Sequence, residues 1–77
     1  MAAIFDEQNL VKLVTMEMPF GKHKGRKLLD IPEEYLLWFR EKGWPGGELG
    51  VLLALLLEIK INGLEYLLAD MRKKIRK

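Results

Sequence analysis

The segment Gly21–Lys27 holds the densest group of side chains in the sequence that could bind an anion. It reads GKHKGRK, and its cations are Lys22, Lys24, Arg26 and Lys27. Glycine lets a ligand approach the backbone closely, so Gly21 and Gly25 together with these cations could hold a phosphate group. It is not a Walker A loop, because three residues rather than four separate the glycines. Alternatively, the glycines satisfy a tight hairpin turn and the lysines keep an edge hairpin soluble.

His23 lies in the middle of this segment and is the single histidine of the sequence. A metal site needs several ligands, and there is no second histidine and no cysteine to complete one. We therefore predict no metal site. We expect His23, when it is protonated, to add positive charge to an anion-binding loop.

A second basic run closes the sequence at residues 72–77, which read RKKIRK. The candidate anion contacts there are Arg72, Lys73 and Arg76, which would extend the basic surface of the first segment. Residues 28–71, between the two runs, carry three bases and eight acids, so the net charge is only +2. Alternatively, the run is a solvated, solubilising tail, and cations at the C-terminal end of a helix are favourable whatever the function.

The residue types that are missing exclude several kinds of catalysis. The sequence has no serine and no cysteine, so its hydroxyl groups are those of Thr15, Tyr35 and Tyr66. Serine and thiol nucleophiles, cysteine zinc sites and disulfides are thereby excluded. Glu33 and Glu34 could form a general acid and base pair, but carboxylates in the first turn of a helix also stabilise its dipole, which is the interpretation we favour. We predict no enzyme, no catalytic residue and no cofactor.

The aromatic side chains could stack on exposed bases. Tyr35, Trp38 and Phe39 have helical spacing and should lie on one buried stripe, since a small domain needs such residues in its core. Trp44 stands between glycines in a turn, so it is the aromatic side chain that we predict to be available for stacking. It could equally cap the core or enter a dimer interface.

The elements that must position these residues are predicted by capping residues, apolar spacing and Pro/Gly punctuation. A first helix should run from the Asp6 cap to about Thr15. Two short strands, residues 17–20 and 26–31, should then flank the basic loop as a β-hairpin. Three further helices are predicted. The second helix has Pro32 in its first turn, the third runs from about Glu48 to Ile61, and the fourth starts at a capping box opened by Asn62. The predicted fold is therefore α+β, with four helices and one two-stranded β-hairpin between the first and second helix, in a single domain spanning 1–77.

The third predicted helix is apolar at nearly every position, so it must be covered on most sides. It is either the central helix of the domain or a face for a homodimer or a larger protein. Its candidate contact residues are Leu52, Leu55, Leu56 and Ile59. A 77-residue chain without cysteine has little core to spare, which keeps dimerisation open as a source of stability.

The run MPFGKHKGRKLLDIPEEYLLWFREKG, continued by LGVLLALLLEIKINGLEYLL, carries a family resemblance over about residues 16–68. It resembles a small bacterial family of unknown function described as "putative quorum-sensing-regulated virulence factor". The shorter pattern FGKHKG...IPEEYLLW is similar to a module at the C-terminus of exonucleases of the exodeoxyribonuclease X type. That similarity implies a nucleic-acid-associated module that binds without cutting, because the nuclease domain and its acidic metal-binding motifs are absent.

The sequence thus predicts a non-catalytic protein that binds the phosphate backbone of DNA or RNA through the Gly21–Lys27 segment. The second interpretation is a structural or interaction module that uses the apolar third helix, and the third places the basic C-terminal helix on an anionic membrane surface. The start MAAIFDEQN lacks the features of a signal peptide, so we expect a cytoplasmic bacterial protein. Glu58 and Lys60 interrupt the longest apolar stretch, so no membrane span is expected.

Overall fold

The first helix forms where the sequence supplies a cap and an apolar stripe. The carboxylate of Asp6 accepts a hydrogen bond from the backbone N–H of Gln8 at 3.0 Å, and the helix ends at Thr15 because Met16 is extended. Leu10, Leu13 and Val14 are its buried side chains. The predicted cap, stripe and end of this helix are confirmed.

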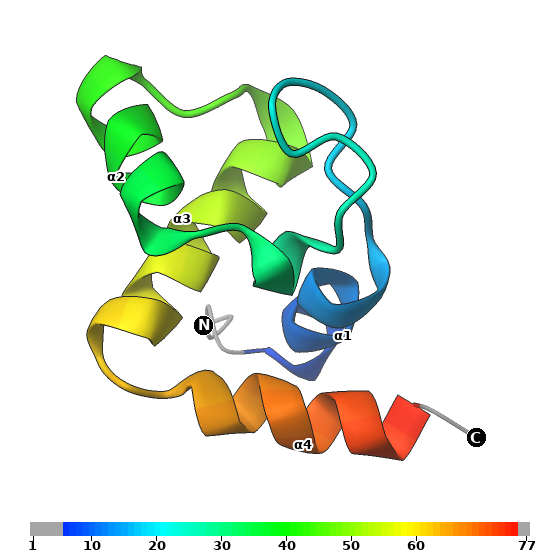
Figure 1. Cartoon of the computed structure of the whole chain (residues 1–77). Coiled ribbons are helices and arrows are strands. Elements are labelled where there is room, and N and C mark those ends of the chain that lie inside the picture. The colour runs from blue at the N-terminus through cyan, green and yellow to red at the C-terminus, as the bar shows by residue number, and fades with distance from the viewer. Residues whose placement is uncertain (1–5, 76–77) are drawn as a thin grey trace.

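The computed structural model describes residues 6–75, which form four α-helices and one short 3₁₀ helix (Figure 1). In chain order the elements are α1 Glu7–Thr15, the 3₁₀ helix η1 Leu28–Asp30, α2 Glu33–Lys42, α3 Gly47–Ile61 and α4 Glu65–Ile75. Pro32 stands at the cap position just before α2, where its missing N–H and extended backbone suit a helix start.

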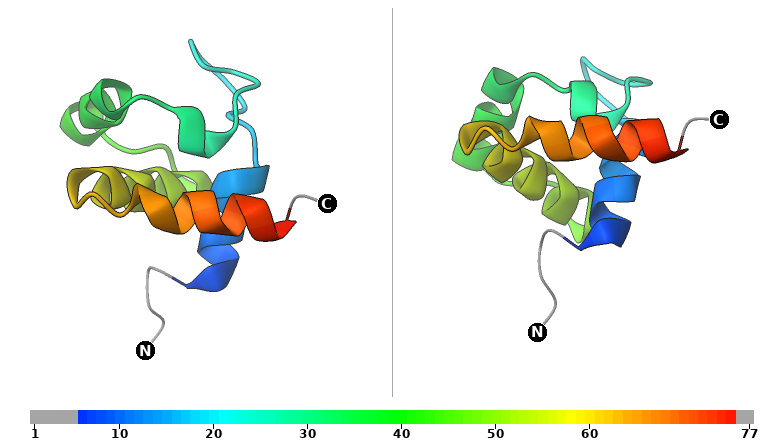
Figure 2. Two further views of the ribbon diagram at one scale, coloured as in Figure 1. Left: turned by 60° about the horizontal axis from the view of Figure 1, so that its bottom comes forward. Right: turned by 90° about the horizontal axis from the view of Figure 1, so that it is seen from below.

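Helix α3 lies at the centre of the fold. Helices α1 and α2 and the 3₁₀ helix η1 all pack against it, and α4 packs against α1 (Figures 1 and 2). Its buried residues are Gly50, Leu52, Leu53, Leu55, Leu56, Leu57 and Ile59. An all-round apolar helix needs cover on most sides, and the other elements of the chain supply it. Of the two places predicted for the third helix, the structure shows the central one.

The predicted β-hairpin, and with it the α+β class, is wrong. The chain does turn back on itself, since the N–H of Met18 donates to the carbonyl of Arg26 at 2.8 Å and the N–H of Leu28 donates to that of Met16 at 2.9 Å. Pairing is limited to one isolated antiparallel bridge between Glu17 and Lys27. Residues 6–75 contain no strand, and the fold is all-α.

The hydrogen bonds on either side of the bridge show why the pairing stops. On the loop side, the N–H of Arg26 donates to the carbonyl of His23 at 3.1 Å instead of to Met18, and the N–H of Gly25 donates to the Met18 carbonyl at 2.8 Å, so the loop closes directly after Met18. On the other side, the chain bends into η1 directly after Lys27, where the N–H of Ile31 donates to the carbonyl of Leu28 at 3.0 Å. The residues predicted as a second strand therefore form a helical turn with Leu28 in the core.

A separate fourth helix is confirmed, but its predicted start is wrong. Asn62 is the C-terminal cap of α3, and its side-chain amide donates to the carbonyl of Glu58 at 2.7 Å. Gly63, at φ 67°, then turns the chain, and α4 begins at Glu65. Asparagine can cap either end of a helix, and here its side chain caps a free carbonyl at the end of α3 instead of an N–H group at the start of α4. No helix of the described region is long and apolar enough to cross a membrane.

Candidate functional site

The basic loop, defined here as Gly21–Lys27, is a compact turn held by its own backbone. Gly21 and Gly25 have φ of 79° and 89°, a region that favours glycine. The N–H of Lys24 donates to Gly21, and that of Arg26 donates to His23, at 3.2 and 3.1 Å. Gly25 donates likewise to Met18 at 2.8 Å. These three amides are already occupied, so they are not available to an anion.

The loop presents Lys22, Lys24 and Arg26 to solvent. Within residues 6–75, the structure pairs none of these three with a carboxylate. Lys27 differs, because its Nζ donates to the carbonyl of Thr15 at 3.2 Å and lies 3.7 Å from a carboxylate oxygen of Glu17. Lys27 therefore ties the loop to the end of α1, and three of the four predicted cations remain open to a ligand.

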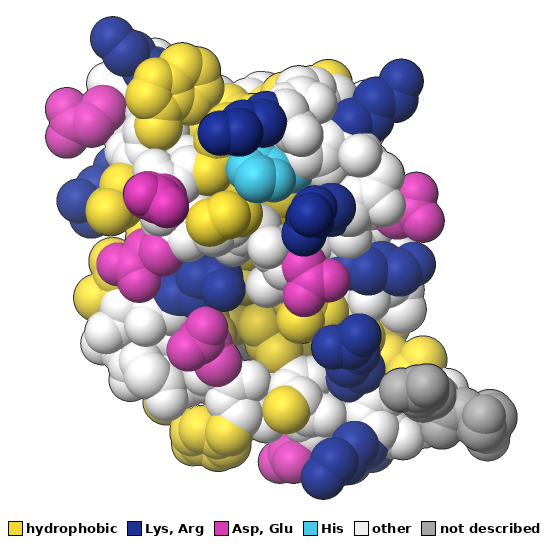
Figure 3. Space-filling view, in the orientation of Figure 1, with side chains coloured by type: hydrophobic (Ala, Val, Ile, Leu, Met, Phe, Trp, Pro, Cys, Tyr) yellow, Lys and Arg dark blue, Asp and Glu magenta, His cyan; other side chains and the backbone are white. Residues whose placement is uncertain are grey.

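His23 connects the loop to α2. Its ring lies 4.6 Å from that of Tyr35, centroid to centroid, and meets it edge to face at 72°. The hydroxyl of Tyr35 lies over Gly21, where an added Cβ would come within 2.7 Å of it. The space above Gly21 is thus filled by Tyr35, which fixes the loop against the helix. In Figure 3 the histidine, in cyan, lies between basic side chains with hydrophobic side chains beside it.

A shallow hollow opens where the loop meets α2. It is lined by Lys22, His23, Pro32, Glu34, Tyr35 and Trp38. The ring of Tyr35 stacks on that of Trp38, with an interplanar angle of 11° and a centroid separation of 6.0 Å. Trp38 is 50% exposed. Positive charge and an exposed indole therefore share one surface.

The prediction that Trp38 is a core residue is wrong, whereas the buried position of Phe39 is confirmed. Trp44, predicted to be the available aromatic, is half-buried and stacks on Phe39 at 6.1 Å, so it caps the core. Leu36 is fully buried, and at 3.6 residues per turn Trp38 stands about 200° around the helix from it. The packing of Leu36 therefore turns Trp38 outward.

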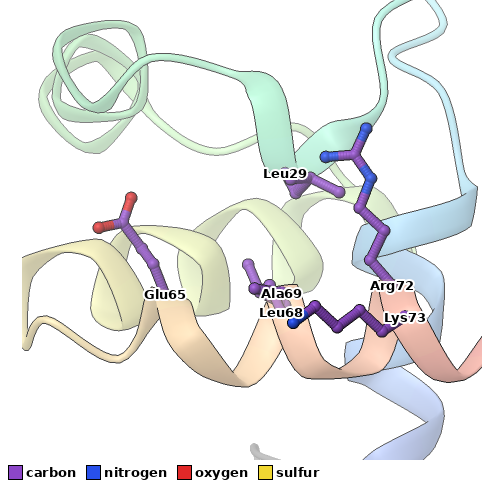
Figure 4. A pocket seen from close by; sticks show the side chains of 6 residues that line it. All are labelled: Leu29, Glu65, Leu68, Ala69, Arg72 and Lys73. Carbon is purple, nitrogen blue, oxygen red and sulfur yellow. The ribbon is translucent and has the colours of Figure 1, made fainter.

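The second basic run lies on another part of the molecule. Arg72 and Lys73 are exposed on α4 and line a groove beside η1 together with Leu29, Glu65, Leu68 and Ala69 (Figure 4). Arg72 reaches toward Leu29, and the carboxylate of Glu65 lies at the other end of the groove. The groove shares no lining residue with the hollow at the basic loop. Arg76, also predicted as a contact, lies outside the described residues.

The side chains predicted as a docking face on α3 point into the core. Leu52, Leu56 and Ile59 are fully buried and Leu55 is 3% exposed. The part of α3 that reaches the surface includes Val51, which is 57% exposed, and Glu58. A partner on α3 would have to contact these residues instead.

The described residues 6–75 hold no group of three or more histidine, cysteine, aspartate or glutamate side chains that could bind a metal ion. Glu33 and Glu34 lie in the first turn of α2, where carboxylates stabilise the positive end of the helix dipole. The hollow at the basic loop combines cations, aromatic rings and the carboxylate of Glu34.

Two known proteins of the same name match this chain over nearly their whole length. A protein called "Uncharacterized protein YpeB" from Escherichia coli strain K12 is 44% identical over 71 residues, which is 91% of this chain and 99% of the relative. The protein of the same name from Escherichia coli O157:H7 matches to the same extent.

No solved structure matches this chain. The matches found include no exonuclease, so the similarity of FGKHKG...IPEEYLLW to an exonuclease module stays a prediction. The family described as "Putative quorum-sensing-regulated virulence factor" matches residues 6–71. That match spans most of the chain, and the aligned region covers 99% of each of the two relatives. This chain therefore belongs to the "Putative quorum-sensing-regulated virulence factor" family.

Proposed function

We propose that this protein binds nucleic acid, and that Lys22, Lys24 and Arg26 of the basic loop contact its phosphates. The observation that carries the proposal is the set of three exposed cations, unpaired with any carboxylate of the described region, beside a hollow with an exposed indole. Unpaired cations can release the counterions of a phosphate backbone without first breaking an ion pair of their own. Lys27, which is bound to Thr15, supports the loop.

Salt dependence tests this proposal most directly. Three phosphate contacts predict that affinity falls by roughly 20- to 40-fold between 50 and 200 mM salt, the smaller value for single strands and the larger for duplex. Fluorescence anisotropy with labelled single-stranded DNA, duplex DNA and RNA measures both affinity and slope. The absence of binding to all three at the lower salt concentration would contradict the proposal.

Charge reversal assigns the effect to the loop. Lys22→Glu together with Lys24→Glu removes two of the three contacts and should weaken binding by about tenfold or more at low salt and flatten the salt dependence by about two thirds. The matched control is Arg40→Glu with Lys42→Glu, because both are exposed cations of α2 outside the lining of the hollow and the net charge changes equally. Equal losses in both double variants would mean that net charge, not the basic loop, carries the binding.

The second candidate is a homodimer formed through α3, which now has less support because its four predicted contact residues are buried in the core. What remains is a small hollow on α3, lined by Val51, Ala54 and Glu58 and by the nearly buried Leu55. Light scattering at high protein concentration tests it. A dimer that Val51→Glu dissociates would favour this candidate, and a strict monomer would remove it.

A further inference from the structure

The hollow beside the basic loop contains a rigid aromatic surface. The indole of Trp38 is stacked on Tyr35, and it meets the ring of Phe39 edge to face at 5.2 Å and 69°. Phe39 is itself anchored in the core with 7% exposure. Half of the Trp38 surface nevertheless faces solvent. The ring is therefore held in one orientation by its neighbours while part of it stays free for a ligand.

The same hollow places positive charge next to this ring. Lys22 and His23 line it from the loop, and Tyr35 and Trp38 line it from α2. The edge-to-face contact of His23 with Tyr35 holds the two sides together. A ligand that fills the hollow must combine a negative charge with a flat apolar face at a short distance. Nucleotides have this combination, with the phosphate next to the base.

Resting on the nucleic-acid binding proposed above, we infer that the hollow binds single-stranded nucleic acid, with a base stacked on Trp38 and the adjoining phosphates on Lys22 and Lys24. In a duplex the faces of the bases are covered by their neighbours. A duplex can therefore bind the loop through its phosphates, but it has no free base to stack on Trp38. Base stacking is tolerant of sequence because every base has a π face. The chemistry is shared by DNA and RNA, and binding to each is measured separately.

The first experiment compares probes on the full chain by fluorescence anisotropy. The probes are labelled oligothymidylate and oligouridylate of about 16 nucleotides, the upper end of the site size of a small single-strand-binding fold, and a duplex of equal length. Unlabelled polyphosphate and polyglutamate serve as competitors that carry charge without bases. We expect the single strands to bind more tightly than the duplex and to resist both competitors. Equal affinity for single strand and duplex, or displacement by either polymer at an equal charge concentration, would overturn the inference.

The second experiment removes the ring. Trp38→Ala should weaken single-strand binding by about 5- to 150-fold, leave duplex binding within about twofold, and be largely rescued by Trp38→Phe, which keeps a flat aromatic face. Tyr66→Ala is the matched control, because Tyr66 is an aromatic residue with 59% exposure on α4, outside the lining of the hollow. Circular dichroism establishes that each variant is folded.

The outcomes separate the two proposals. If no nucleic acid binds the wild-type chain, the proposed function itself fails. If nucleic acid binds with the expected salt dependence but Trp38→Ala has no effect, the loop binds phosphate and the single-strand inference is wrong.

Tryptophan fluorescence gives an independent readout of stacking. The chain has two tryptophans, so Trp44→Phe leaves Trp38 as the only indole. Oligothymidylate should quench its emission, and polyphosphate, which has no base, should not. Binding seen by anisotropy without quenching in this variant would contradict a base stacked on Trp38.

Discussion

Glu34 is the one carboxylate among the residues that line the hollow, and it opposes the proposed ligand. Its charge repels phosphate from the surface where Lys22 attracts it. Surface charge pairs of this kind are worth about 0.2–1 kcal/mol, so Glu34→Gln should tighten nucleic-acid binding by about 1.4- to fivefold at low salt. Anisotropy titration measures this change, with Glu41→Gln, an exposed carboxylate of α2 outside the lining, as the control. Weaker binding in Glu34→Gln would mean that the carboxylate accepts a hydrogen bond from the ligand and that the site recognises more than phosphate.

The two glycines of the basic loop should differ in their response to alanine. Both have positive φ, which costs an L side chain about 1–2 kcal/mol. At Gly25 nothing lies within 4 Å of an added Cβ, so Gly25→Ala should cost only that amount. At Gly21 the Cβ would come within 2.7 Å of the Tyr35 hydroxyl, so Gly21→Ala should cost more and displace the ring.

A double-mutant cycle separates the contact from the backbone strain. Tyr35→Phe removes the hydroxyl, so Gly21→Ala should be less destabilising in that background, and chemical denaturation measures the difference in the free energy of unfolding. Gly25→Ala in the same background serves as the control and should cost the same as in the wild type. Additive effects of Gly21→Ala and Tyr35→Phe would show that the loop and α2 are not coupled through this contact.

At the scale of elements, the start of α3 depends on a close approach between its backbone and the preceding turn. A Cβ added at Gly50 would lie 1.9 Å from the carbonyl oxygen of Pro45, which is backbone and cannot rotate away. Gly50→Ala should therefore destabilise the fold by about 1–3 kcal/mol or more, as overpacking does. Gly46→Ser is the control, since Gly46 has open space around it at the N-cap of α3, where serine is favoured. Thermal denaturation of both variants tests this, and equal stability of the two would contradict the close approach.

The helices were predictable from sequence because their signals are local. The Asp6 cap, the glycine after α2 and the unbroken apolar run of α3 each act within a few residues. The error at residues 17–31 has a different origin. The alternation of glycines and short apolar pieces there is typical of a hairpin, but whether a strand forms depends on partners that lie far along the chain. Leu28 and Ile31 are fully buried, and η1 packs on α1 and α3, so packing wins over the local pattern.

The candidate site was only partly predictable for the same reason. The cations of the basic loop are visible as a run of residue types, and the structure leaves Lys22, Lys24 and Arg26 open to solvent. Which tryptophan stays exposed depends on the rotation of α2 relative to α3. Spacing alone groups Tyr35, Trp38 and Phe39, but Leu36 and Phe39 are the positions that face the core. The exposed indole beside the loop therefore emerges only once α2 is packed.

At the scale of the whole molecule, positive charge is divided between two surfaces. Figure 3 shows basic side chains from the upper part of the molecule down to α4, with acidic side chains between them. A single strand that followed both surfaces would have to pass these carboxylates. The cations of α4 also have a structural role, because Arg72, Lys73 and Lys74 lie in its last turn, where they stabilise the negative end of the helix dipole.

The two surfaces can be ranked by salt dependence. Arg72→Glu together with Lys73→Glu should destabilise α4 by about 0.3–1 kcal/mol per residue but reduce nucleic-acid affinity much less than the Lys22 and Lys24 double variant, because Glu65 shares the groove at α4. If α4 does not contact the strand, the variant keeps the wild-type slope of log affinity against log salt, which is about −2 for a single strand. If both cations of α4 bind phosphate, the slope of the variant is smaller in magnitude than that of the wild type by about 1.4. We expect the unchanged slope, measured by anisotropy at temperatures where circular dichroism finds both variants folded. A reduced slope would instead mean that the strand contacts both basic surfaces, along a path from the basic loop to α4.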